Sequence, residues 1–410
     1  MERFKRLSRR NFFGLAGLAV GTAACSRIKI LNTETSSLLP TKPTPDSLTI
    51  SPTATTTLTP ELPPTPDTRG YFEKYVYPAL LTVAEKRRNE KAEKDPDFWH
   101  RVDKELNTQR INFDLLGFGS ESKQGVKNTD SIQLMPLDLK ENELRIISIK
   151  RDTWAPEIER ETEYGGHRRI NSAFLLGGMP LAEKVLEDAT GLSSDFVLGM
   201  EMEVLSRAVK DVFGNKLEVC IPWNINDVAM GYFKKGPQTL DGDDVLRIAR
   251  ARQFTGGSNS TRNFMQQLIL RTMMGRVKTE LSSGAINAAG FITKSLVFFE
   301  KETRGGNIVA NFNLGLFLDL GFELGKKVLK EGVGENKGFG MPEFTARYEI
   351  ETEPALDPYD VTRHKPKGGN PNSEDLVADY WTSARAGVKT FLTSPVDKSG
   401  FEEGDTCTAK

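Results

Sequence analysis

Short apolar runs alternate with amphipathic segments through the middle of the 410-residue chain. Residues 111–117, 131–139 and 144–149 are apolar runs of strand length, and the short polar turn between the last two predicts a β-hairpin. Pro136 removes a backbone donor from the first hairpin strand. The sequence therefore predicts either a local irregularity at Pro136 or an edge position for that strand.

Helical patterns lie between the predicted strands. One helix is predicted from Pro180 to Gly191, with proline in its first turn and glycine just past its end. A second helix is predicted over 203–212, and residues 217–222 are predicted to be a strand. The acidic start of residues 241–250 favours a helix N-terminus. Such alternation indicates the α/β class, as a layered α-β-α domain with a central mixed β-sheet flanked by helices.

The first 25 residues have the pattern of an export signal. The pair Arg9-Arg10 stands before an apolar stretch over residues 12–24, which resembles a Tat signal and is shorter than the roughly 20 residues of a spanning helix. Residues 22–25 resemble a lipobox, which predicts lipidation at Cys25; an uncleaved anchor and ordinary cleavage are the alternatives. The sequence thus predicts export to the cell envelope and attachment to the outer face of the cytoplasmic membrane through this N-terminal anchor.

The composition changes sharply after the signal. Residues 26–70 are rich in Pro, Thr and Ser and hold too few large apolar side chains to offset the entropy of ordering, so we expect a disordered, extended tether. Residues 71–106 mix apolar and charged positions at helical spacing and are predicted to form a helical lead-in. We expect the main folded domain over residues 107–345 and a C-terminal extension over residues 346–410.

Composition narrows the function classes. A formal net charge of −1 offers no basic face for a phosphate backbone, so we expect no nucleic acid partner. Hydrophobic residues make up 38% and charged residues 27%, as in a globular body. Only three histidines are present, which argues against Ser-His-Asp chemistry and His-rich zinc sites. Of the three cysteines, Cys220 and Cys407 lie beyond the signal, and the sequence does not decide whether they pair.

Charged and amide side chains gather at the ends of the predicted elements. Asp130 opens a strand, and Arg151 and Asp152 close the next one. Arg262 and Gln266 are four residues apart and share a face if that segment is helical. The other members of this set are Arg169, Asn171, Arg250 and Arg252.

Several of these segments, in order, resemble the LytR-CpsA-Psr family. They are the apolar run ending in LLG, the DSI strand, SIKRDT (148–153), RRINSAF (168–174), GPQTLDGDDVLRIARAR (236–252) and an R-x-x-x-Q helix. The resemblance covers roughly residues 112–269. Enzymes of this family transfer a glycopolymer from undecaprenyl pyrophosphate to peptidoglycan and form a phosphodiester. The resemblance therefore implies that the main domain is a phosphotransferase with a polyprenyl pyrophosphate-linked glycan and peptidoglycan as partners.

The resemblance also implies roles for single residues. Arginine suits a pyrophosphate clamp because its planar fork matches phosphate oxygens and stays charged when it is desolvated. The implied clamp residues are Arg151, Arg250, Arg252 and Arg262, with Asp152 as a weaker candidate that alternatively orients Arg151. The implied substrate-binding residues are Arg169, Asn171 and Gln266. Asp130 is implied as a ligand of Mg²⁺, the expected cofactor, which prefers hard oxygen ligands.

This chain also departs from the family pattern. Gly119 stands where the family has a second metal-binding Asp, and Glu121 is the nearest acid and the second candidate metal ligand. Lys150 stands in place of a proline, and Asn259 in place of an acid. Two alternatives stay open: a hydrolase that acts on the same lipid pyrophosphate with water, and a non-catalytic envelope lipoprotein that binds polyprenyl phosphates. The sequence does not name the glycopolymer or the acceptor hydroxyl.

Two apolar segments have two interpretations. Residues 284–299 and 310–325 are rich in large apolar side chains and glycine. By the family resemblance they would line a channel for the lipid tail, and by the simpler interpretation they are ordinary core helices.

Overall fold

The computed structural model describes residues 70–119, 128–161, 169–251, 259–331, 341–354, 364–366 and 377–395, all in the second of two compact units, Pro66–Lys410. The export signal with Cys25, nearly all of the tether, Glu121, Arg252 and Cys407 lie outside these residues. Among the described helices, none has the length and apolar character needed to cross a bilayer.

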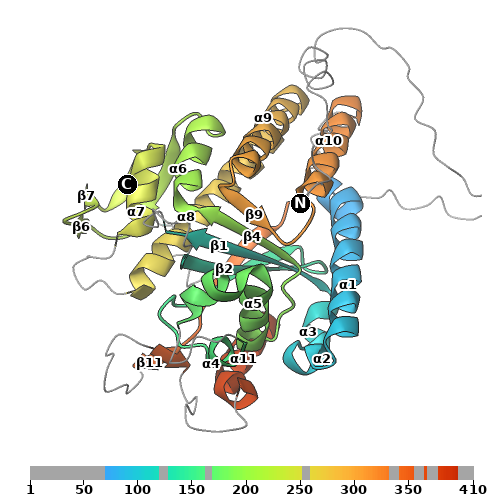
Figure 1. The fold of residues 1–410 in the computed structure, drawn as a ribbon. Helices are drawn as coiled ribbons and strands as arrows, with labels where there is room; N and C mark the ends of the chain where they lie inside the picture. Colours follow the sequence, from blue (N-terminus) through green and yellow to red (C-terminus); the bar gives the residue numbers. More distant parts are fainter. Residues whose placement is uncertain are drawn as a thin grey trace, which may run out of the picture. The chain divides into compact units, whose positions relative to one another are not determined.

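A six-stranded mixed sheet runs through the described body in the order β10-β3-β2-β1-β4-β9 (Figure 1). Its strands are β1 (Arg110–Phe118), β2 (Thr129–Asp138), β3 (Glu143–Ser148), β4 (Phe196–Glu201), β9 (Ile308–Ala310) and β10 (Glu343–Glu349). The pairs β1–β2, β2–β3 and β4–β9 are antiparallel, whereas β1–β4 and β3–β10 are parallel. The predicted α/β class with a central mixed sheet is confirmed.

Six shorter strands form two-stranded ribbons. They are β5 (Leu217–Ile221) with β8 (Gly236–Leu240), β6 (Ile225–Asp227) with β7 (Gly231–Phe233), and β11 (Thr352–Pro354) with β12 (His364–Pro366). Cys220 in β5 is disulfide-bonded, and both cysteines that could pair with it lie outside the described residues. Whether Cys220 pairs with Cys407 therefore stays an open question.

The described helices surround the sheet. A π-helical turn, η1 (Phe72–Val76), precedes the first helix, and a 3-10 turn, η2 (Ile170–Ser172), precedes the fifth. The helices are α1 (Tyr77–Lys94), α2 (Phe98–Arg101), α3 (Lys104–Thr108), α4 (Pro156–Glu161), α5 (Ala173–Thr190), α6 (Met202–Asp211), α7 (Gly242–Arg250), α8 (Asn259–Ser282), α9 (Ala285–Arg304), α10 (Leu314–Glu331) and α11 (Val377–Thr393).

Helices cover both faces of the sheet, as the alternation of side chains along a strand requires. On one face, Leu116, Ile132 and Leu134 pack into the core cluster that α5 and α11 also supply. Figure 1 shows α5 and α11 as ribbons. On the other face, Ile111 packs with residues of α1 such as Leu80. The strands are therefore apolar on both sides, which is why they appear in the sequence as short continuous apolar runs.

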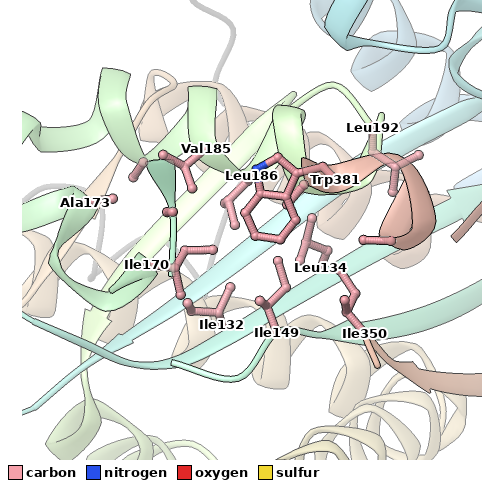
Figure 2. Packing of buried hydrophobic residues seen from close by; sticks show 14 of the residues in the cluster. Ile132, Leu134, Ile149, Ile170, Ala173, Val185, Leu186, Leu192, Ile350 and Trp381 are labelled. Carbon is pink, nitrogen blue, oxygen red and sulfur yellow. The ribbon is translucent and has the colours of Figure 1, made fainter. Parts of the chain in front are cut away.

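The C-terminal helix α11 completes the core of the first face. Trp381 lies among Leu134, Leu186 and Ile350 (Figure 2), and its side chain is fully buried. The indole Nε1 of Trp381 donates a hydrogen bond to a carboxylate oxygen of Glu157. Strand β10 contains residues from both sides of the predicted boundary between 345 and 346, and the division into domains stays a prediction.

The structure decides the question of Pro136. The hairpin β2–β3 is confirmed, and β2 lies inside the sheet, so an edge position is wrong. The paired residues of β2 with β3 include Leu134 and Leu137 but neither Met135 nor Pro136, and this gap is the local irregularity that the missing donor predicts.

The predicted helix at residue 180 is the second part of α5. The α5 segment contains a non-helical backbone at Gly178 (φ 65°, ψ −157°), and Pro180 follows this kink. Gly191 ends the helix in the left-handed conformation (φ 72°), as the sequence predicts for a glycine at this position.

A buried ion pair fastens α1 to the sheet. Arg88 donates to Asp195 through Nε (2.8 Å) and also through Nη2, and both side chains are buried. The same guanidinium donates to the carbonyl oxygens of Asn107 (2.6 Å) and Arg110 (2.8 Å). Asp195 in turn accepts from the backbone N–H of Asn112 at 3.0 Å. The Arg88 guanidinium and the Asp195 carboxylate thus both have hydrogen-bond partners in the protein, as buried charged groups require.

Candidate functional site

The start of β2 lies beside the end of β3, where both strands reach the same end of the sheet. The strands are antiparallel, and Gln133 pairs with Ser148, so the chain before Gln133 lies beside the chain after Ser148. Asp130 and Arg151 come together here, and Arg151 Nη1 donates to Asp130 Oδ1. Both side chains are partly exposed. Two of the predicted site residues thus form a direct ion pair.

Asp152 connects two arginines. Its carboxylate is buried, with Oδ2 at 3.6 Å from Arg151 Nε and Oδ1 at 3.3 Å from Arg169 Nη1. The backbone strengthens this arrangement, because the N–H of Asn171 donates to the carbonyl oxygen of Arg151 at 3.3 Å. The segment from Arg169 to Asn171 is therefore held against the loop that carries Arg151.

Helix α8 brings a third arginine to the same place. Arg262 is buried, and its Nη2 donates to the backbone carbonyl oxygen of Asp130 at 3.0 Å. The predicted helical spacing of Arg262 and Gln266 is confirmed, since both lie in α8. Gln266 accepts from Gln133 Nε2 at 3.3 Å and donates to the carbonyl oxygen of Ala249 at 3.1 Å. Gln266 thereby joins β2, α8 and the end of α7.

Arg250 is the last residue of α7. Its Nη2 donates to Glu203 Oε1 of α6 at 2.6 Å, and this ion pair fixes the direction of the side chain. The bond from Gln266 to Ala249 places the backbone next to Arg250 close to α8. Among the described residues, direct contacts join Asp130, Arg151, Asp152, Arg169 and Arg262, while Arg250 lies on a neighbouring helix end and contacts Glu203.

Three polar residues that the sequence reasoning missed lie beside this group. Glu349, the last residue of β10, has Oε1 at 3.3 Å from Lys150 Nζ and accepts from Asn263 Nδ2 at 3.0 Å through Oε2. Lys150 and Asn263 are the chain neighbours of Arg151 and Arg262. The departure from proline at Lys150 was a signal for this cluster, whereas nothing in the sequence points to Glu349 before β10 is known to pair with β3.

Gly119 lies against the carboxylate of Asp130. A β-carbon built on Gly119 would be 2.7 Å from Asp130 Oδ2, so residue 119 is placed where its side chain would meet this acid. Across the described part of the chain, no group of three or more His, Cys, Asp or Glu side chains is arranged to hold a metal ion. Of the two predicted metal ligands, only Asp130 lies among the described residues, and Arg151 and Arg262 contact it. That set fits Mg²⁺ only in the common arrangement in which one or two carboxylates share the ion with water and phosphate oxygens.

The arrangement has the chemistry of an anion site. Arg151, Arg169 and Arg262 carry three fixed positive charges, and two acids, Asp130 and Asp152, hold them in place. Arg151 Nε is buried and faces Asp152 Oδ2 at 3.6 Å, so this side of the guanidinium is turned toward the acid. The fold is that of an α/β protein, and at one end of its central strands three arginines and two acids come together, a set of side chains whose chemistry suits a phosphate-like anion.

Comparison with known proteins gives the family. The LytR_cpsA_psr family model matches residues 74–292, more than half of the chain, and the protein belongs to this family. TagV of Bacillus subtilis strain 168, named a polyisoprenyl-teichoic acid–peptidoglycan teichoic acid transferase, is 26% identical over 176 residues, which are 41% of this chain and 44% of TagV. Regulatory protein MsrR of Staphylococcus aureus is 26% identical over 160 residues, 39% of this chain and 47% of MsrR.

The matched part spans about half the length of these curated relatives. Among solved structures, the crystal structure of B. subtilis TagV is similar with a TM-score of 0.48 and 20% identity, over 70% of this chain and 100% of that one.

Proposed function

We propose that this protein transfers a glycopolymer from a polyprenyl pyrophosphate carrier to peptidoglycan. Membership of the LytR_cpsA_psr family supports this reaction class, and so does the name of TagV, which describes such a transfer of teichoic acid. The observation that carries the proposal is the convergence of Arg151 and Arg262 on Asp130, because two guanidinium groups from different elements then face one substrate phosphate.

The proposed reaction is a phosphoryl transfer. An acceptor hydroxyl oxygen of peptidoglycan forms a bond to the phosphorus that carries the glycan, and the P–O–P bridge breaks. The polyprenyl monophosphate leaves, and the hydroxyl proton passes to solvent. Positioning and charge stabilisation supply most of the rate acceleration in such reactions, and the protein needs to form no covalent bond.

The arginines have separate tasks in this proposal. Arg151 and Arg262 bind the pyrophosphate oxygens, and Arg250 extends the clamp from the end of α7. Arg252, which lies outside the described residues, is the fourth proposed member of the clamp. Arg169 binds on the substrate side together with Asn171 and Gln266. Asp152 keeps Arg151 and Arg169 at fixed positions, since it contacts both guanidinium groups.

Asp130 would hold Mg²⁺, with Glu121 as its second protein ligand. The bound ion would neutralise charge on the phosphate oxygens. In the described structure Asp130 Oδ1 accepts from Arg151, so the same carboxylate holds the clamp in position. The protein would act at the outer face of the cytoplasmic membrane, to which the Tat-like signal and a lipid on Cys25 would bring it.

A second candidate is a non-catalytic envelope protein that binds polyprenyl phosphates. Gly119 favours it, because the position that lies against Asp130 lacks an acid and Asp130 is engaged by Arg151. In that case the arginines would hold a lipid phosphate without turnover.

One assay separates the candidates. The full chain is given a polyprenyl pyrophosphate-linked glycan, peptidoglycan and Mg²⁺, and both wall-bound glycan phosphate and released lipid monophosphate are measured. We expect transfer by the wild type, and a loss of about 10²- to 10³-fold with Arg151→Lys, which keeps the charge but loses the fork.

Arg276→Lys is the matched control, because Arg276 lies on the exposed side of α8 and contacts only Glu280 among the described ion pairs. Lipid release without acceptor, at a rate independent of peptidoglycan, would identify a hydrolase instead. Binding of the lipid without any turnover would identify the non-catalytic protein. Equal activity of the Arg151 and Arg276 variants would refute the arginine clamp.

A further inference from the structure

Strand β10 adds a polar cluster next to the arginines, although it lies outside the segment that the family model matches. Glu349 pairs with Ser148 in the parallel β3–β10 register. Glu349 therefore lies at the end of β3 after which the chain continues to Arg151. Lys150 and Asn263 contact its two oxygens at 3.3 Å and 3.0 Å. Lys150 directly precedes Arg151 in the chain, and Asn263 directly follows Arg262. The cluster is therefore adjacent in sequence to two of the predicted clamp arginines.

An aromatic cluster continues from Glu349 along the same face of β10. Arg347 is two residues before Glu349, hence on the same side of the strand. Its guanidinium carbon lies 4.0 Å from the centre of the Phe264 ring, and the Phe264 and Trp223 rings are 5.0 Å apart at 47°. Trp223 and Phe264 pack against the core cluster beneath them, and Phe264, Trp223 and Arg347 are each partly exposed.

These groups differ in kind from the anion site beside them. A carboxylate repels a pyrophosphate, so Glu349 does not suit the donor. A partly exposed carboxylate, with a partly exposed aromatic stack further along the same strand face, suits a neutral ligand that has many hydroxyl groups and an apolar ring face. The hydroxyl groups donate to Glu349, whose carboxylate the buried Asn263 helps to hold in place, and the ring face packs on an aromatic side chain. A sugar has this chemistry.

We propose that Glu349, Asn263 and the Trp223–Phe264–Arg347 stack form the subsite that binds the acceptor sugar. This inference rests on the proposed function, because it assigns to β10 and α8 the second substrate of the same transfer. The subsite orients the sugar beside Arg151 and Arg262, and Lys150 keeps the Glu349 carboxylate in place. The acceptor is therefore recognised by a strand that lies beyond the family-matched residues.

The competing explanation is that the contacts of Lys150, Glu349 and Asn263 have only a structural role, namely to hold the edge strand β10 in the sheet. The two explanations differ in the kinetic parameter that changes. A fastening contact affects folding and all activities together. A binding contact affects the Michaelis constant of the acceptor and leaves the donor steps as they are.

The test uses the full chain, a polyprenyl pyrophosphate-linked glycan as donor and a soluble peptidoglycan oligosaccharide as acceptor. For Glu349→Gln and for Trp223→Leu we expect the acceptor KM to rise about ten- to hundredfold, with kcat and the donor KM changed by less than about threefold. Glu351→Gln is the matched control, because Glu351 is an exposed acid two residues further along. Thermal unfolding of each variant accompanies the kinetics.

An acceptor KM for Glu349→Gln equal to that of Glu351→Gln would overturn the subsite. So would a joint loss of thermal stability and of kcat at constant acceptor KM, which is the signature of a fastening contact. If the wild type transfers nothing, the proposed function fails on its own. The subsite is then decided by calorimetric binding of the oligosaccharide, which Glu349→Gln must weaken by the same factor.

Discussion

The buried contact between Arg88 and Asp195 makes a sharp prediction about stability. The substitution Arg88→Met keeps the length of the side chain and removes its charge and its donors. Asp195, whose side chain is fully buried, then loses both bonds from Arg88 and keeps only the N–H of Asn112. The carbonyl oxygens of Asn107 and Arg110 lose a donor as well.

The magnitude follows from burial. Removing one partner of a buried ion pair costs about 3–5 kcal/mol, because the other charge stays buried without compensation. For a body of this size, each kcal/mol lowers the melting temperature by about 2–4 °C, so we expect a fall of roughly 6–20 °C. Urea unfolding followed by circular dichroism measures the same loss as a change in midpoint at constant slope.

The matched control is Lys86→Met on the same helix. Lys86 lies 3.8 Å from Glu90 in a pair whose side chains are 75% and 50% exposed, so we expect a change below about 0.5 kcal/mol. Adding Asp195→Asn to Arg88→Met removes the buried charge that has lost its partner. The double variant should therefore be destabilised by about 1 kcal/mol or more less than the sum of the losses of the two single variants. If Arg88→Met costs no more than Lys86→Met, or if the double variant is additive, the uncompensated charge is not the cause.

Two further predictions concern the core and the metal ligand. Full burial raises the pKa of Asp114 to about 8, even though Ser194 Oγ donates to it at 2.5 Å. The folded state therefore holds a proton that the unfolded state releases near pH 4, and stability should fall as the pH rises from about 5 to 8, with a slope of up to ~1.4 kcal/mol per pH unit from this group. Asp114→Asn should flatten that part of the stability curve, measured by urea unfolding across the range, and an unchanged slope would exclude Asp114 as its source. A β-carbon at residue 119 would come within 2.7 Å of Asp130 Oδ2, so the Asp130 carboxylate has to turn aside equally in Gly119→Asp and in Gly119→Ala. Only Gly119→Asp adds a second carboxylate, so calorimetry should detect tighter Mg²⁺ binding in it than in Gly119→Ala; equal affinities would argue against a metal site at Asp130.

The sequence predicts the local elements well where one signal dominates. Gly191 ends α5 because a left-handed residue is needed there, and glycine adopts that conformation without strain. The hairpin β2–β3 follows from two apolar runs and a polar turn. Pro136 is different, because a missing donor is tolerated either at an edge or at a break in pairing, and the neighbours of β2 in the sheet decide between these two.

Much of the candidate site was also predictable, but its partners were not. Asp130, Arg151, Asp152, Arg169 and Arg262 stand in segments with recognisable patterns, and the structure joins them by direct contacts. The partners of the acids and amides depend on contacts over long sequence separations. Glu349 meets Lys150 only because β10 pairs with β3 across almost two hundred residues, and no local pattern encodes that register.

The position of α11 has a consequence for the folding of the protein during its synthesis. Trp381 fills the space among Leu134, Leu186 and Ile350 (Figure 2). Because synthesis proceeds from the N-terminus, Trp381 is added to the chain after these three residues. Until then, one face of the sheet lacks its last large side chain and exposes apolar surface to chaperones and proteases. A prematurely terminated chain would keep that exposed surface permanently. The core on this face of the sheet therefore closes only after α11 has been synthesised.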